Sequence, residues 1–218
     1  MNAPNDSGPT AAKLSRRADS LGTENAFVVL AEVNALVRQG KDIVSFCIGQ
    51  PDFPVPESIK NAAIAAIRGD KNGYSVTQGI PELRAKLQAA VDERYHHADR
   101  RVLVTSGTSG SLVLAVLAMV NPGDEVIVFD PYFVMYPALV GMVGGTCVTI
   151  DTYPDFRIDP ERVVAAITPR TKMILLNSPA NPTGAVAGEA ELRALAALAA
   201  KHDIALVSDE IYREFCYD

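Results

Sequence analysis

Three polar segments, each at the end of a short apolar run, hold the side chains best suited to chemistry. The first, residues 105–111, reads Thr-Ser-Gly-Thr-Ser-Gly-Ser and opens an apolar stretch with helical character. Glycine lets the backbone approach an anion closely, and the free N–H groups at a helix start favour negative charge. With hydroxyl donors from Thr108, Ser109 and Ser111, the segment predicts a phosphate-binding turn. A Ser/Thr helix cap with glycine for flexibility explains the same residues without a ligand.

The other two segments place an amide and a carboxylate after later apolar runs. Residues 177–184 read Asn-Ser-Pro-Ala-Asn-Pro-Thr-Gly, and residues 207–212 read Val-Ser-Asp-Glu-Ile-Tyr. The first is also an ordinary turn composition, because Asn, Pro and Gly all favour turns. A carboxylate such as Asp209 at the end of a buried strand is costly unless it meets a cation or hydrogen-bond donors. Asp209 therefore indicates either a binding site for a positive group or a cap for the next helix.

The elements that must position these residues alternate after residue 100. Runs rich in Val, Ile and Leu predict buried strands at 101–105, 125–130, 147–151, 172–177 and 204–209. Helical stretches separate most of them, at 109–120, 132–143, 160–167 and 189–202. This alternation predicts an α/β fold with a parallel sheet covered by helices on both faces. Right-handed crossovers then bring the strand C-termini to one edge, where ligands of open α/β sheets bind.

The first hundred residues have a different character. Residues 1–24 are polar and rich in small side chains, so we expect a loose arm there. Apolar spacing predicts helices over 25–40 and 56–69 and a further helix from Pro81, the last two with proline in the first turn. A turn-rich loop that carries Tyr74 joins these two helices.

Composition excludes several classes of protein. The 218 residues include 20 Lys and Arg against 26 Asp and Glu, a net charge of −6, which argues against a nucleic-acid binder. The longest apolar run, 112–120, is far shorter than the roughly 20 residues of a membrane span. No signal peptide, Walker A loop or dinucleotide fingerprint is visible. Three scattered cysteines and three histidines predict a cytoplasmic protein without a metal site.

A series of short motifs occurs in one order along the chain, at residues 49–53, 74, 79–84, 106–110, 130–132, 181–184 and 208–212. In this order and spacing the chain resembles the fold-type I, aspartate-aminotransferase-like family of pyridoxal-phosphate enzymes (aminotransferase class I and II). The resemblance runs from about residue 25 to residue 218. It implies a three-layer αβα large domain that binds pyridoxal 5'-phosphate over 51–218, and an N-terminal arm with part of a small domain over 1–50.

The resemblance also implies which residues hold the cofactor. They are Thr108 and Ser109 at the phosphate, Phe133 on the pyridine ring, Asn181 and Tyr212 at the phenolic oxygen, and Asp209 at the ring nitrogen. An ionised carboxylate beside that nitrogen keeps it protonated, and the positive ring then withdraws electrons from the substrate Cα. Many members carry Trp where this chain has Phe133, which offers a smaller apolar face. Ordinary core packing remains the alternative for Phe133.

Substrate and partner contacts follow from the same resemblance. The backbone of Gly49, together with Asn181, would meet the substrate carboxylate. Tyr74 would reach the cofactor phosphate of a neighbouring subunit, which implies a homodimer with shared active sites. The alternative for Tyr74 is an ordinary aromatic residue on a surface loop.

One essential group of the family is missing from this sequence. The resemblance implies a lysine that forms a Schiff base, in a Ser-x-x-Lys-like segment well after Asp209, and no lysine up to Asp218 lies in that context. We therefore expect a C-terminally truncated chain with no catalytic residue of its own, an incomplete large domain and no activity alone. Two strands of the family's sheet would also be absent, which would leave the strand at 101–105 without neighbours.

The function implied for the complete parent is transfer of an amino group between an amino acid and a 2-oxo acid. The same cofactor residues suit a β-lyase or a decarboxylase, so these reactions remain alternatives. A non-catalytic module for pyridoxal-phosphate binding or dimerisation is a third possibility.

Overall fold

Four parallel strands form the central sheet in the computed structural model, which describes residues 15, 17–18, 25–96 and 99–217. The strands are β1 (Glu125–Asp130), β2 (Thr146–Asp151), β3 (Thr171–Asn177) and β4 (Ala205–Asp209), in the order β2-β1-β3-β4. The register pairs Asp130 with Asp151 and Asn177 with Asp209. The last residues of all four strands therefore lie along one edge of the sheet.

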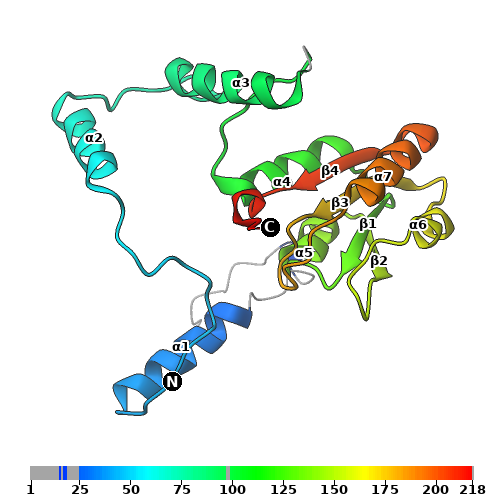
Figure 1. The fold of residues 1–218 in the computed structure, drawn as a ribbon, viewed down its shortest axis with the longest axis horizontal. Coiled ribbons are helices and arrows are strands. Elements are labelled where there is room, and N and C mark those ends of the chain that lie inside the picture. The colour runs from blue at the N-terminus through cyan, green and yellow to red at the C-terminus, as the bar shows by residue number, and fades with distance from the viewer. Residues whose placement is uncertain (1–14, 16, 19–24, 97–98, 218) are drawn as a thin grey trace, which may run out of the picture. The chain divides into compact units, whose positions relative to one another are not determined.

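Helices cover both faces of this sheet (Figure 1). One face packs against α4 (Gly107–Met119) and α5 (Met135–Met142), and the other against α6 (Pro160–Ala166) and α7 (Glu189–His202). Side chains alternate across a strand, so Val126 and Val128 enter the first core while Ile127 enters the second. All three are fully buried, and each such burial contributes about 1.5–3 kcal/mol. The predicted three-layer αβα arrangement is confirmed.

The chain divides into two units, which we describe separately. The helical unit, Asn25–Ser111, contains α1 (Asn25–Arg38), α2 (Glu57–Arg68) and α3 (Pro81–Tyr95), close to the helices that the sequence predicts. The sheet unit is built around Leu112–Asp218, so the first residues of α4 belong to one unit and the rest to the other. A short 3-10 helix, Arg213–Phe215, follows β4. The predicted arm over 1–24 lies almost wholly outside the described residues.

Two predicted elements differ in the structure. Residues 101–105 do not form a strand. A strand requires a neighbour, and here the backbone N–H of Val104 donates to Gln78 and that of Val102 to the side chain of Gln88. The helix predicted from residue 132 begins only at Met135, because Pro131 and the next residues form an irregular connection from β1.

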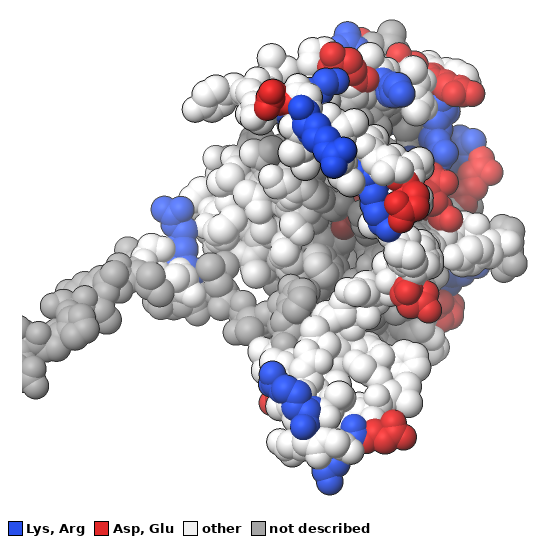
Figure 2. Space-filling model, turned by 90° about the vertical axis from the view of Figure 1, so that its left-hand side faces the viewer, with Lys and Arg blue, Asp and Glu red and all other residues white. Residues whose placement is uncertain are grey.

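Charged side chains of both signs lie next to one another on the face drawn in Figure 2. The helices also carry exposed ion pairs, such as Lys60 with Glu57 at 2.7 Å and Arg193 with Glu189 at 2.6 Å. Exposed pairs of this kind contribute little to stability. Among the helices in the described part of the chain, none combines the length and apolar character needed to cross a bilayer.

Candidate functional site at the carboxyl edge of the sheet

Asp209 is a buried carboxylate at the end of β4, with only 6% of its surface exposed. The phenol hydroxyl of Tyr136, in α5, donates to its Oδ2 at 2.8 Å. Its Oδ1 accepts from the backbone N–H of Ile211 at 3.3 Å. Both oxygens therefore have a donor, which offsets part of the cost of burial. The sequence left open that Asp209 caps the next helix, but the 3-10 helix Arg213–Phe215 has Tyr212 at its N-cap and no side-chain cap. The Ile211 contact is a local turn contact, and Tyr136 is a long-range donor.

Tyr136 is a site residue that the sequence did not single out. It is 1% exposed, and its ring meets the ring of Phe133 edge to face, with centroids 5.7 Å apart. Burial raises the pKa of the Tyr136 phenol, and the hydrogen bond to Asp209 raises it further, so the hydroxyl keeps its proton. The one available signal was a tyrosine inside the otherwise apolar stretch 135–142. Phe133 itself is half-buried against the core around α4 and α5.

Asn177, at the last position of β3, is a second site residue that the sequence did not single out. Its Oδ1 accepts from the backbone N–H of Asn181 at 2.7 Å, and its Nδ2 donates to the backbone carbonyl of Asp209 at 3.0 Å. The backbone N–H of Ser178 donates to the same carbonyl at 3.1 Å. The turn that carries Asn181 is thereby tied to the end of β4.

Asn181 and Tyr212 lie together at this edge. The Nδ2 of Asn181 is 3.4 Å from the hydroxyl oxygen of Tyr212, which is 37% exposed. The Asn181 turn closes through a hydrogen bond from the N–H of Gly184 to the carbonyl of Ala180 at 2.7 Å. Gly184 has a φ of +72°, a conformation that glycine adopts readily. An amide, a phenol and a carboxylate thus gather in the sheet unit from residues far apart in sequence.

The predicted phosphate turn lies in the helical unit. α4 begins at Gly107, whose φ is +68°, so Thr108 and Ser109 occupy the first helical turn. N–H groups in a first turn have no partner within the helix and remain available to an anion. The hydroxyl of Ser111 lies 2.7 Å from that of Thr105. Ser111 is thus engaged within the turn, while Thr108 and Ser109 keep the predicted position at the helix start.

Gly49 and Tyr74 also belong to the helical unit and lie on its loops. Gly49 is exposed between α1 and α2, and Tyr74 is fully exposed between α2 and α3. Their predicted roles concern a substrate and a second subunit, so both roles stay predictions.

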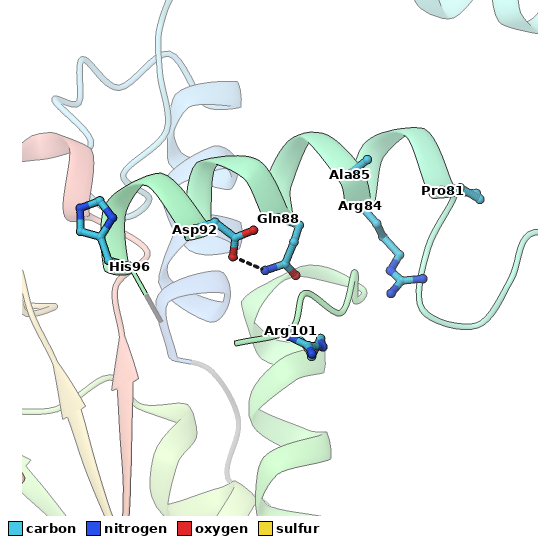
Figure 3. A pocket seen from close by; sticks show the side chains of 7 residues that line it. All are labelled: Pro81, Arg84, Ala85, Gln88, Asp92, His96 and Arg101. Carbon is cyan, nitrogen blue, oxygen red and sulfur yellow. Dashed lines mark hydrogen bonds between the residues drawn. The ribbon is translucent and has the colours of Figure 1, made fainter. Parts of the chain in front are cut away.

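Two cavities differ in their relation to these residues. A cleft of about 630 Å³ in the helical unit contains none of the predicted site residues (Figure 3). There Gln88 and Asp92 of α3 are joined by a hydrogen bond of 2.8 Å, and Arg84 and Arg101 line the same hollow. A smaller cavity of about 40 Å³ in the sheet unit is lined by Tyr136 and Asn177, among others. The smaller cavity therefore lies next to the site, because Tyr136 is hydrogen-bonded to Asp209 and Asn177 to Asn181.

Comparison with known proteins gives a family match and several similar relatives. The family model for aminotransferase class I and II matches residues 41–218. An aspartate/prephenate aminotransferase from Thermus thermophilus is 44% identical over 213 residues, which cover 94% of this chain and 54% of that protein. An asparagine–oxo-acid transaminase from Streptococcus mutans is 37% identical over 211 residues, with 94% and 54% covered. The chain spans about half the length of these curated relatives.

Solved structures give the same result. Aspartate aminotransferase from Thermus thermophilus with maleate superposes with a TM-score of 0.88 at 44% identity, over 95% of this chain and 55% of that one. Alanine aminotransferase from Pyrococcus furiosus gives a TM-score of 0.87 at 32% identity, over 94% and 54%. The family model covers most of the chain, and the fold and the sequence agree. The chain therefore belongs to the aminotransferase class I and II family.

Proposed function

We propose that the protein is a pyridoxal-phosphate-dependent aminotransferase that moves an amino group between an amino acid and a 2-oxo acid. The observation that carries this proposal is the buried carboxylate of Asp209 at the end of β4, held by Tyr136 and tied through Asn177 to the turn of Asn181. A buried carboxylate with remaining acceptor capacity suits a protonated ring nitrogen.

The donor set fits the proposed cofactor. Asp209 would hold the proton on the ring nitrogen, and Asn181 and Tyr212, 3.4 Å apart, would donate to the ring oxygen. Phe133 would cover one face of the ring. These four residues all belong to the sheet unit. Thr108 and Ser109, at the start of α4, are the residues proposed for the phosphate from the sequence resemblance. When bound, pyridoxal phosphate supplies an electron-withdrawing ring that makes the substrate Cα–H acidic.

The base that moves the Cα proton would be a lysine in a Ser-x-x-Lys-like segment, and no lysine of residues 1–218 lies in such a segment. Gly49 and Asn181 would orient the substrate carboxylate. Tyr74, fully exposed on its loop, would complete the phosphate site of a second copy of the protein in a homodimer. Aspartate is the first amino donor to test, because several similar relatives are named for it.

The test uses protein expressed from the complete reading frame. Pyridoxal phosphate is titrated into the apoprotein, and aspartate, asparagine or alanine is then supplied with 2-oxoglutarate. Stoichiometric binding and formation of glutamate with the matching 2-oxo acid are the expected results. Release of ammonia or carbon dioxide without glutamate would instead assign a lyase or decarboxylase. Absence of cofactor binding would overturn the proposal altogether.

A further inference from the structure

We propose that Tyr136 is a positioning residue that orients the Asp209 carboxylate toward the ring nitrogen of the cofactor. This inference rests on the proposed function, since it concerns how the ring nitrogen is recognised. It adds a residue from α5 to a site whose other members in the sheet unit come from strand ends and the turns that follow them.

The first argument is the geometry of the contact. Tyr136 and Asp209 are 73 residues apart in the sequence, and the hydroxyl lies 2.8 Å from Oδ2. Both residues are nearly inaccessible to water, at 1% and 6% exposed. A buried phenol needs a partner, and this carboxylate provides one. The pair therefore fixes the rotation of the carboxylate about its side-chain bonds.

The second argument is acceptor capacity. A carboxylate has about four lone-pair sites, and the structure fills two of them, with Tyr136 on Oδ2 and Ile211 on Oδ1. The contact from Ile211 is long, at 3.3 Å, so Tyr136 is the stronger of the two donors. Capacity remains for a third donor, and a protonated ring nitrogen supplies one N–H.

The third argument concerns charge. The pKa of Tyr136 is raised by burial and by Asp209, so its hydroxyl stays a donor throughout the physiological pH range. A donor of this kind stabilises an ionised carboxylate in a site of low polarity. The remaining lone pairs of the carboxylate can then accept a hydrogen bond from the N–H group of the ring.

The fourth argument is rigidity. The Tyr136 ring packs in the core with Val128 and Leu175, and it contacts Phe133 edge to face. Phe133 is the residue expected on the face of the cofactor ring. Tyr136 thus contacts both Phe133, expected on the face of the cofactor ring, and Asp209, expected at the ring nitrogen. Removing only the hydroxyl, by Tyr136→Phe, leaves this packing in place.

The test compares two ligands in protein from the complete reading frame. One is pyridoxal phosphate, and the other is its carbon analogue, in which C–H replaces the ring nitrogen. Tyr136→Phe should weaken binding of pyridoxal phosphate about tenfold, because the contact acts on a charged group, and should change binding of the analogue less than twofold. In an Asp209→Asn background, Tyr136→Phe should change pyridoxal-phosphate binding less than twofold.

Tyr153→Phe is the matched control, because Tyr153 is an exposed tyrosine of the same unit. It should leave both affinities unchanged. Equal weakening of both ligands by Tyr136→Phe would mean that the residue serves only packing, and unchanged binding of both would mean that it has no role. Either result overturns the inference while the proposed function stands. Failure of the unsubstituted protein to bind pyridoxal phosphate would overturn both.

Discussion

The side-chain amide of Asn177 donates to the backbone carbonyl of Asp209 at 3.0 Å and so joins the ends of β3 and β4. The same amide accepts from the backbone of Asn181 at 2.7 Å. One half-buried side chain thus sets the distance between a turn and a strand end that both belong to the candidate site. Parallel pairing of Asn177 with Asp209 in the register makes this possible.

Replacing Asn177 by Ala should destabilise the protein. The change removes two hydrogen bonds and leaves the backbone N–H of Asn181 without its acceptor, while the Asp209 carbonyl keeps the bond from Ser178. We therefore expect a loss of about 1–3 kcal/mol in the free energy of unfolding. Urea denaturation measures this loss. Asn121→Ala is the control, since Asn121 is exposed and its amide donates to Asp124 at 3.2 Å, so its loss should cost less than about 0.5 kcal/mol. An equal loss in the free energy of unfolding for the two variants would contradict this role of Asn177.

Replacing Asp209 by Asn should abolish most of the proposed activity. The amide carries no charge with which to hold a proton on a ring nitrogen, so kcat/KM for aspartate should fall about 100-fold or more in the complete protein. Asp203→Asn is the control, because Asp203 lies at the exposed C-terminal end of α7 in a left-handed conformation that Asn tolerates. Activity within threefold of the parent for Asp209→Asn would show that this carboxylate has no role in the reaction.

Glu125, at the opposite edge of the sheet, should make stability depend on pH. A hydrogen bond from Thr168 and the neighbouring Arg170 hold the pKa of this carboxyl below its ordinary value of 4.5. In the unfolded chain the carboxyl binds its proton more readily. The contribution of Glu125 to the free energy of unfolding is therefore present above about pH 4.5. It is lost as the pH falls through the lower pKa that this carboxyl has in the folded protein.

Thr168→Val tests this dependence. The substitution removes the hydrogen bond from Thr168 to Glu125 but keeps the shape of the side chain. Its cost in the free energy of unfolding, measured by urea denaturation, should be greatest near pH 6 and should shrink toward pH 3. Thr149→Val, on the exposed side of β2, should show no such trend. A cost for Thr168→Val that stays constant over this range would refute the prediction.

Cys147 should react slowly with alkylating reagents in the folded protein. Burial raises the pKa of its thiol to about 11, and only the thiolate reacts. At pH 8 about one thiol in a thousand is then ionised, against about a quarter at the ordinary pKa of about 8.5. Mass spectrometry after timed iodoacetamide labelling should show at least 100-fold slower modification than in guanidinium-unfolded protein. Similar rates in the two states would contradict the assigned burial.

The local pattern of the sequence was enough for most of the fold. The strand over 125–130 and the helix over 189–202 match β1 and α7 at both ends, because apolar periodicity and helix-terminating residues act within a few positions. The segment 101–105 has an equally clear strand pattern but forms no strand. Its failure has a physical reason, since a strand exists only when a neighbour accepts and donates its hydrogen bonds.

The sequence also predicted some residues of the candidate site and missed others. Motif order alone pointed to Asn181, Asp209 and Tyr212, and alternation of strands and helices predicted that strand ends would meet at one edge. Tyr136 and Asn177 were not predicted, because their contacts join residues that no spacing rule connects. Only packing of α5 on the sheet brings the Tyr136 hydroxyl to Asp209, and only the parallel register brings the Asn177 amide to the end of β4. The sequence by itself determined which groups are present, and the tertiary structure decided which of them touch.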